Sequence, residues 1–513
     1  MEYLLTAPSL VFTPAALLAI LAGTVIGLVV GALPGLGSVV AITLVLPFSF
    51  TMDTVPAICL ILAVYCCSVF GGSYSAILLN TPGTPQSAAT VLDGYAMARR
   101  GKADLALGWA TGASVIGGLF STLVLLFFAA PLARVALSFG PIENFALTCL
   151  ALTCIAGVAG RNFVLGIIAG LIGLFIASVG VDPLSGETRM TFGFFNLSSG
   201  VELIPVLIGI FAIAEVFARA TSVGPVDGEP VEKIAAGFRI APMRDWVARS
   251  GTLLKSSVIG SFVGVLPGTG AATASFISYA VAKRTGRFRK NIGDGEPEGI
   301  VASEAANNAV TGGALVPTLA LGIPGDPVTA VMMSALVIHG IQPGTRLFVE
   351  TPELIYACFI ALLVINVVMF FAAGPFGRIF SRILHLPDSI IAALVLILSV
   401  LGAYGVRGNV FDLYVMVIAG VVGYLMRLAA IPAAPVVIGM VLGPFVEESL
   451  RQGLILTDGD LSGFFSRPIA AALLSFTILI VLVAAGLSIM GLLRKTSQDD
   501  SAGASGNPAG PKH

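Results

Sequence analysis

The sequence predicts an all-α polytopic membrane protein built from two related halves of inverted topology. Three observations carry this prediction: the composition, an internal repeat and the placement of basic residues along the chain. Apolar residues make up 57% of the 513 positions, charged residues make up 11%, and the mean hydropathy is +0.99. A spanning helix needs roughly 20 mostly apolar residues, and such stretches recur along nearly the whole chain. The composition therefore places the chain in a bilayer.

An internal repeat relates the two halves. Residues 27–41 read GLVVGALPGLGSVVA and residues 260–274 read GSFVGVLPGTGAATA, so the glycines and the Leu-Pro-Gly triplet recur 233 residues later. A second motif, NTPGTP at residues 80–85, recurs as GIPGDP at residues 322–327. Two motifs in the same order indicate duplication. Duplication is common among secondary transporters, whose substrate sites lie where interrupted helices of the two repeats meet.

The basic residues predict how the halves are oriented. In the first half, no basic residue follows the first motif, whereas Arg99, Arg100 and Lys102 follow the second. In the second half, the basic cluster 283–290 follows the first motif and only Arg346 follows the second. Because cytoplasmic loops carry an excess of Lys and Arg, equivalent loops lie on opposite sides of the membrane. The repeats should therefore be inverted.

The same rule predicts that each LPGxG segment forms a re-entrant hairpin. Arginines precede the second LPGxG segment and the cluster 283–290 follows it, so both of its flanks should be cytoplasmic. The return leg, residues 271–282, is too short to cross a core that needs roughly 20 residues. An ordinary short helix capped by glycine is the alternative.

Apolar runs then give about eleven transmembrane helices and the two candidate re-entrant hairpins. We expect a first repeat at residues 1–220, a cytoplasmic linker at 221–249, a second repeat at 250–495 and a disordered cytoplasmic tail at 496–513. Two of the expected spans contain the NTPGTP and GIPGDP breaks. Others lie near residues 105–130, 135–157, 163–180, 201–218, 353–375, 387–405, 411–428, 431–446 and 469–493.

Several classes of function find no support in the sequence. The net charge of −1 offers no broad basic field for a nucleic acid. The chain has three histidines and no HExxH, GxSxG or GxxxxGK[ST] motif, so it lacks the parts of a protease, a lipase or an ATP-driven pump. The six cysteines lie in apolar runs without a CxxC pair, which favours small buried side chains. We expect no catalytic residue, no cofactor and no tightly bound metal.

The interrupted segments predict a binding cavity. Irregular Pro-Gly backbone is tolerated at membrane depth only where protein or a water-filled cavity receives it. A helix that starts after such a break points free N–H groups and a positive dipole end at the cavity, which suits an anion such as a carboxylate. Kinks that serve helix packing are the alternative. The candidate substrate-binding residues, from the four breaks and one polar helix face, are Pro34, Gly35, Gly37, Ser38, Asn80, Thr81, Pro82, Gly83, Thr84, Pro267, Gly268, Thr269, Gly270, Thr273, Asn307, Asn308, Pro324 and Gly325.

The second half carries a polar helix face that the first half lacks. Glu304, Asn307, Asn308 and Thr311 share one side of a helix because they fall at i, i+3, i+4 and i+7. When the glycine doublet at 71–72 is paired with the one at 312–313, their first-half counterparts are apolar or thiol side chains. These counterparts are Ala63, Cys66, Cys67 and Phe70.

An acidic group at membrane depth usually marks an ion or proton route. Asp326 replaces the neutral Thr84 of the first repeat, and the candidate cation-coupling residues are therefore Glu304, Asn308, Thr311 and Asp326. Amide and carboxylate oxygens suit Na⁺, whereas a carboxylate alone can carry H⁺, and the sequence does not separate the two. For Glu304, a solvated helix end is the alternative.

Four long segments resemble a known family. GALPGLGSVVAITLVLPFSF, GGSYSAILLNTPGTPQSAATVLDGYAMARRGKADLALG, GVLPGTGAATASFISYAVAKR and GEPEGIVASEAANNAVTGGALVPTLALGIPGD closely resemble the large, TctA-type membrane subunit of the tripartite tricarboxylate transporters. The resemblance implies a multi-pass subunit of the bacterial cytoplasmic (inner) membrane. It also implies a small four-span membrane subunit and a periplasmic solute-binding protein as partners. The implied activity is import of citrate-like tricarboxylates or other carboxylates, driven by a Na⁺ or H⁺ gradient.

Other functions stay open at this point. One is a stand-alone carboxylate carrier or channel without partner subunits, although a channel needs a continuous polar pore and the polar residues here cluster at the breaks. Another is an embedded enzyme, which would have to combine Ser or Thr with Glu304 or Asp326 and without histidine. Accumulation of the substrate against a gradient would exclude the channel, and covalent change of the substrate would indicate the enzyme.

Overall fold

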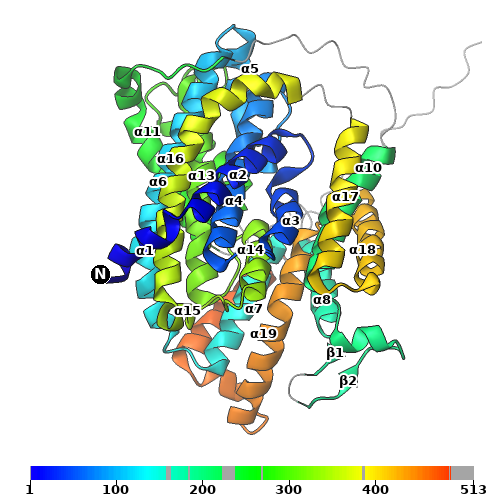
Figure 1. Cartoon of the computed structure of the whole chain (residues 1–513). Helices are drawn as coiled ribbons and strands as arrows, with labels where there is room; N and C mark the ends of the chain where they lie inside the picture. The colour runs from blue at the N-terminus through cyan, green and yellow to red at the C-terminus, as the bar shows by residue number, and fades with distance from the viewer. Residues whose placement is uncertain are drawn as a thin grey trace, which may run out of the picture.

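The fold consists almost wholly of helices. The computed structural model describes residues 2–157, 163–182, 185–221, 237–266, 270–383, 388–483 and 486. Most of the long helices run between the upper and lower ends of the molecule as drawn in Figure 1. In chain order the helices are α1 (Glu2–Val11), α2 (Pro14–Ala32), α3 (Gly37–Ser49), α4 (Thr54–Leu79), η1 (Pro85–Ser87), α5 (Ala88–Arg99), α6 (Ala103–Ala136), α7 (Pro141–Gly157), α8 (Phe163–Ala177), η2 (Phe195–Ser199), α9 (Leu203–Leu207), η3 (Ile208–Ile213), α10 (Ala214–Thr221), α11 (Met243–Val265), α12 (Gly270–Thr285), α13 (Pro297–Leu321), α14 (Pro327–Ile338), α15 (Leu347–Glu350), α16 (Pro352–Ile383), α17 (Asp388–Arg407), α18 (Val410–Leu428), α19 (Ala434–Leu456) and η4 (Leu461–Phe465).

Seven of the described helices are long and apolar enough to cross a membrane, so the chain is a polytopic membrane protein. Four further apolar helices are shorter: Gly37–Ser49, Val164–Ala177, Pro327–Ile338 and Pro468–Val483. Within the described residues, the apolar runs expected from residue 105 onward recur as helices, which confirms the all-helical prediction. The seven long candidates are Pro14–Ala32, Thr54–Leu79, Ala103–Val135, Leu203–Thr221, Pro352–Phe380, Ser389–Arg407 and Val410–Leu428.

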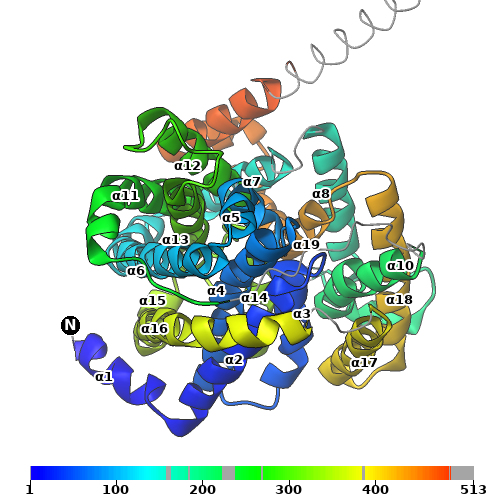
Figure 2. The same cartoon turned by 90° about the horizontal axis from the view of Figure 1, so that it is seen from above.

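Helix α13 lies at the centre of the molecule. It packs against α4, α5, α6, α11 and α12, which surround it in the view from above (Figure 2). Every residue from Glu298 to Ala320 is buried. Protein rather than lipid therefore encloses this helix, and it can carry polar side chains that a lipid-facing helix could not.

The two halves repeat one order of elements around this centre. In the first half, the pair α2–α3 is followed by α4, the NTPGTP break, α5 and the long helix α6. In the second half, the pair α11–α12 is followed by α13, the GIPGDP break, α14 and the long helix α16. Within each half the first helix packs closely against the third, α2 on α4 and α11 on α13.

Close helix contacts correct the sequence alignment of the halves by one residue. A Cβ on Gly31 would lie 2.2 Å from the carbonyl oxygen of Ser68, and a Cβ on the equivalent Gly264 would lie 2.8 Å from that of Val310. The third helices are thus offset by 242 residues, as are the breaks, so Gly71 matches Gly313. The expected offset was one residue too small because the glycine doublets were aligned directly, whereas backbone contact sets the register. The counterparts of Glu304, Asn307, Asn308 and Thr311 are Leu62, Tyr65, Cys66 and Val69.

The two interrupted helices run in opposite directions. The end of α5 lies at the upper end of Figure 1, whereas α14 leads to α15 near the lower end. A Cβ on Gly295, just before α13, would lie 3.2 Å from the backbone nitrogen of Met97 in α5. The chain therefore enters α13 at the same end of the molecule at which it leaves α5.

A second group of helices stands beside this central body. Helices α8, α10, α17 and α18 lie together at the right of both views (Figures 1 and 2). A separate apolar cluster joins α8, α9, η3, α18 and α19 through Ala169, Val206, Ile210, Ala419 and Met440. The group meets the central body at α3, which packs against α17 and η3.

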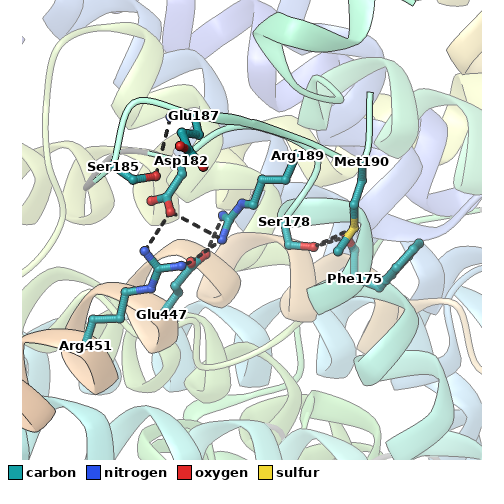
Figure 3. Close-up of polar contacts among 9 residues, drawn as sticks. All are labelled: Phe175, Ser178, Asp182, Ser185, Glu187, Arg189, Met190, Glu447 and Arg451. Atoms are coloured by element: carbon teal, nitrogen blue, oxygen red, sulfur yellow. Dashed lines mark hydrogen bonds and ion pairs between the residues drawn. The ribbon is translucent and has the colours of Figure 1, made fainter. Parts of the chain in front are cut away.

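A short antiparallel hairpin lies at the lower end of the second group, and the sequence analysis did not predict it. Strand β1 (Gly180–Val181) pairs with β2 (Thr188–Arg189). Arg189 Nη2 donates to Glu447 Oε2 of α19 at 2.8 Å, and Arg451 Nη1 donates to Asp182 Oδ2 at 2.7 Å (Figure 3). Beside the Arg189 guanidinium, the pKa of the Glu447 carboxyl is lowered from its ordinary value. Two arginines and two carboxylates thus tie the hairpin to α19.

Candidate functional site

The two helix breaks share one construction. Asn80 with φ 58° caps the C-terminus of α4, and Gly322 with φ 71° caps that of α13, so the backbone leaves both helices through a left-handed residue. Thr84 then caps η1 and Asp326 caps α14, and in both cases a proline occupies the next position. The repeat predicted from six-residue motifs is therefore also a repeat of backbone geometry.

Asp326 is fully engaged within the protein. Its Oδ1 accepts from the backbone nitrogen of Thr329 at 2.7 Å, and its Oδ2 accepts from the Tyr65 hydroxyl at 2.6 Å. The side chain is 2% exposed. Because Tyr65 belongs to α4, this contact links a helix of the first half to the break of the second half. Sequence reasoning missed Tyr65, although the 242-residue offset makes it the counterpart of the candidate residue Asn307.

Helices α3 and α12 are the return helices, which follow the two LPGxG segments. The first residue of each has free space around it. Gly37 begins α3 and Gly270 begins α12, each at φ 70°, and a Cβ on either would meet no atom of the described residues within 4 Å. Ser38 follows Gly37 with 2% exposure, and its hydroxyl has no hydrogen-bond partner among the described residues. The start of α3 therefore offers unpaired N–H groups and a hydroxyl donor at one place.

An ion-pair cluster holds the tip of the first hairpin. Arg219 Nη2 donates to the carbonyl oxygen of Pro34 at 2.6 Å, and its Nε lies 3.0 Å from Glu215 Oε1. Arg427 of α18 reaches the other oxygen of Glu215 at 2.5 Å. A Cβ on Gly35 would lie 2.7 Å from Glu215 Oε1. The sequence analysis did not single out Arg219, and the Glu–Arg spacing of four residues was the available signal for the pair.

Each return helix packs against the interrupted helix of the other half. Helix α3, which carries Gly37 and Ser38, packs against α14, which follows Pro324 and Gly325. Helix α12, which carries Gly270 and Thr273, packs against η1 and α5, which follow the NTPGTP break. The four predicted breaks thus form two groups. One group combines the start of α3 with the GIPGDP break, and the other combines the start of α12 with the NTPGTP break.

Packing explains two of the predicted glycines. A Cβ on Gly83 would lie 2.3 Å from the carbonyl oxygen of Gly31, and a Cβ on Gly325 would lie 2.6 Å from Ala314 Cα. At these positions the glycine serves close contact of backbones. Asn80, Thr81, Gly35 and Thr273 are exposed on the molecule. Three predicted residues, Pro267, Gly268 and Thr269, lie outside the described residues.

Glu304 forms a second buried carboxyl cluster, apart from Asp326. Its side chain is 0% exposed, so the alternative of a solvated helix end is wrong. The Thr90 hydroxyl of α5 donates to Oε1, and the Ser114 hydroxyl of α6 donates to Oε2 at 2.9 Å. Glu304 lies about 25 Å along the helix axis from Leu321, the last residue of α13. The two carboxyls therefore belong to different parts of the molecule.

The two asparagines of the polar face keep free hydrogen-bonding capacity. Asn307 Nδ2 donates to the carbonyl oxygen of Val69 at 3.4 Å, and Thr311 Oγ1 donates to that of Asn308 at 2.7 Å. Within the described residues, Asn307 Oδ1 and Asn308 Nδ2 have no partner, and both side chains are buried. An unpaired buried polar atom costs about 1–3 kcal/mol, which is consistent with a polar ligand at this face.

Interrupted helices with open N-termini, helices exchanged between the halves and buried carboxyls in a polytopic protein are features typical of a membrane transporter. The chain belongs to the tripartite tricarboxylate transporter TctA family, because the model of that family matches residues 17–438. The family consists of transporters rather than enzymes, and the resemblance drawn from the four sequence segments is confirmed.

Two relatives come from Agrobacterium vitis. One, described as an uncharacterized 52.8 kDa protein in the TAR-I ttuC' 3'region, is 34% identical over 472 residues, which cover 92% of this chain and 93% of the relative. The other, an uncharacterized protein in the TAR-II ttuC' 3'region, is 34% identical over 225 residues, 44% of this chain and 93% of the relative. No solved structure matches the chain.

Proposed function

We propose that the chain is the large permease subunit of a binding-protein-dependent secondary transporter that imports citrate-like tricarboxylates or other carboxylates. The observation that carries the proposal is family membership over residues 17–438, a range that contains both LPGxG segments and both helix breaks. The family name supports the substrate class and the tripartite assembly. A small four-span membrane subunit and a periplasmic solute-binding protein complete the transporter in the bacterial cytoplasmic (inner) membrane.

The proposed topology has about eleven spans, two re-entrant hairpins and two inverted repeats. The opposite directions of the two interrupted helices support the inversion, as do the basic residues at the end of α5 and after α12. The first repeat occupies residues 1–220 and the second residues 250–495. The linker 221–249 and the tail 496–513 are assigned to the cytoplasm.

The proposed substrate site lies between the return helices and the breaks that they meet. The open N-terminus of α3, with Gly37 and the unpaired Ser38 hydroxyl, supports anion binding in the first group. Asn307 and Asn308 supply further unpaired polar atoms from α13. The binding protein delivers the carboxylate at the outer face, and movement of one helix group relative to the other exposes it at the inner face.

The proposed driving force is a Na⁺ or H⁺ gradient that acts through the buried carboxyls. Neither Glu304 nor Asp326 has an arginine, lysine or histidine among its described hydrogen-bond partners. A buried carboxyl without a positive partner favours uptake of a cation or a proton. Asn308 and Thr311 flank Glu304 on the same face of α13 and are retained as coupling candidates.

Uptake in cells tests this function. Labelled citrate and a panel of other carboxylates are supplied to cells that express the chain with its two partners or without one of them. Uptake that needs all three components and saturates with one class of carboxylate is the expected result. Uptake by the chain alone would support a stand-alone carrier, and uptake of none of the carboxylates would contradict the proposal.

A further inference from the structure

We propose that Glu304 is a proton-binding site whose proton is held by a chain of hydroxyl groups from two halves of the molecule. This hydrogen-bonded series runs from Glu304 through the Thr90 hydroxyl of α5 to the Ser303 hydroxyl of α13. The inference deepens the proposed function, because it names H⁺ as the coupling ion. It assigns positioning roles to Thr90, Ser303 and Ser114, three residues that the sequence did not single out.

The first argument comes from the count of hydrogens. The Thr90 hydroxyl contacts both Glu304 Oε1 and, at 2.9 Å, Ser303 Oγ, yet it has one hydrogen to donate. Ser303 Oγ in turn lies 3.1 Å from the carbonyl oxygen of Gly299 and 3.2 Å from that of Ile300. When Glu304 carries a proton on Oε1, it donates to Thr90, Thr90 donates to Ser303, and Ser303 donates to the helix carbonyls. Each contact then holds one hydrogen.

The hydroxyl groups of Thr90 and Ser303 can also form hydrogen bonds when the Glu304 carboxylate is ionised. After the proton leaves, Thr90 turns its hydrogen to Glu304 Oε1 and Ser303 turns its hydrogen to Thr90, so the chain reverses without movement of heavy atoms. Ser114 donates to Oε2 at 2.9 Å in both states. Rotation of two hydroxyls is thus enough to follow gain or loss of the proton.

The second argument comes from the charges around the site. The titratable groups on neighbouring elements have partners of their own: Asp93 of α5 accepts from Tyr279 of α12 at 2.8 Å, and Arg249 of α11 pairs with Glu296. Helix α4 contributes three buried thiols, Cys59, Cys66 and Cys67, and Asp104 at the start of α6 pairs with Arg239. None of the described hydrogen bonds or ion pairs brings a positive group to Glu304. An ionised carboxylate here would be a buried charge without a counter-ion.

The third argument separates H⁺ from Na⁺. The contacts of Thr90 with Ser303 and of Ser114 with Glu304 are both 2.9 Å, which is hydrogen-bond distance. A metal cation must lie between its oxygen ligands and needs several of them, about six to eight for a cation of the size of Ca²⁺. The distances between the oxygens of the cluster therefore favour hydrogen bonds and a bound proton over a bound Na⁺.

Infrared difference spectroscopy of the purified full chain in lipid nanodiscs tests the proton site without transport. Spectra are compared between neutral and alkaline pH, in sodium or choline chloride. We expect a protonated carboxylic acid band at neutral pH that disappears in Glu304→Gln and shifts in Ser114→Ala. Thr111→Val is the matched control, because Thr111 lies in α6 as Ser114 does. Its hydroxyl donates to the carbonyl oxygen of Leu107 in that helix at 2.8 Å. This variant should leave the band unchanged.

Two results would overturn the proposal: no band at neutral pH that depends on Glu304, or loss of that band when choline is replaced by sodium. Transport is measured in parallel with all three components in proteoliposomes, where Glu304→Gln should lose uptake driven by a pH gradient. If the wild-type assembly moves no carboxylate under any gradient, the proposed function fails, whereas the infrared band still decides whether Glu304 binds the proton.

Discussion

The Tyr65–Asp326 hydrogen bond is the residue-scale contact that ties the first half to the break of the second. Tyr65→Phe removes the donor at 2.6 Å from a buried carboxyl, and a hydrogen bond to a charged group contributes about 1.5–3 kcal/mol. Tyr74→Phe is the matched control, because the Tyr74 hydroxyl donates to the neutral carbonyl oxygen of Ala373, also at 2.6 Å. We expect the larger fall in thermal unfolding temperature for Tyr65→Phe in detergent. Equal or reversed falls would contradict the assignment.

The ion pairs of the β-hairpin give a pH prediction at the same scale. Arg189 lowers the pKa of Glu447 in the folded protein, so the pair stabilises the fold above the ordinary glutamate pKa of about 4.3. This stabilisation is lost as the pH falls through the lowered folded value. Both side chains are partly exposed, which limits the effect to about 0.2–1 kcal/mol.

The measurement is thermal unfolding of Glu447→Gln and wild type over a pH series. Wild type should be the more stable protein at pH 7, and the difference should vanish in acid. Glu448→Gln is the control, because the hydrogen bond that Glu448 accepts among the described residues comes from Gln452 in its own helix, at 3.0 Å. A stability difference that grows as the pH falls would mean that Arg189 does not hold Glu447 in its charged form.

Single residues were predictable where a local pattern exposed them. Glu304 was found because helical spacing and an apolar background marked it within one segment. Tyr65 and Arg219 were not found, because their partners Asp326 and Pro34 lie 261 and 185 residues away along the chain. No local pattern reports such a contact, and the 242-residue register that relates Tyr65 to Asn307 only became clear from the packing.

At the scale of elements, glycine contacts set how closely α2 approaches α4 and how closely α11 approaches α13. A Cβ on Gly260 of α11 would lie 2.3 Å from the carbonyl oxygen of Ala306 in α13. Gly260→Ala should therefore separate the helices and destabilise the protein by about 1–3 kcal/mol. Gly251→Ala in the same helix is the control, since its Cβ would meet no atom within 4 Å and alanine favours helix. Unfolding in detergent compares the two, and equal stability would contradict the tight α11–α13 contact.

The sequence anticipated most elements because two signals agreed. Apolar runs of spanning length predicted the long helices, and the duplicated motifs located both breaks at Asn80 and Gly322. It did not anticipate the hairpin β1–β2, whose two-residue strands leave almost no alternation to detect. Nor did it show that α3 packs on α14 and α12 on α5, because exchange between halves is a long-range property.

At the scale of the whole molecule, the account predicts which loops face each side of the membrane. Ser199 follows the β-hairpin near the lower end of Figure 1, whereas Lys290 lies in the loop between α12 and α13; both are exposed. In intact cells, a membrane-impermeant thiol reagent that reaches the periplasm should label Ser199→Cys and leave Lys290→Cys unlabelled until the cells are opened. The unmodified chain is the control for its native cysteines. Labelling of Lys290→Cys in intact cells would contradict the inverted orientation.

Energy coupling is the central claim, and uphill transport in a defined system tests it most directly. The full chain is reconstituted in proteoliposomes with its small membrane subunit, and the binding protein is added outside with labelled carboxylate. We predict accumulation of the carboxylate above its outside concentration when an inward H⁺ gradient is imposed, and collapse of the accumulation when the gradient is dissipated. Equilibration without accumulation under both H⁺ and Na⁺ gradients would show a channel and contradict the account.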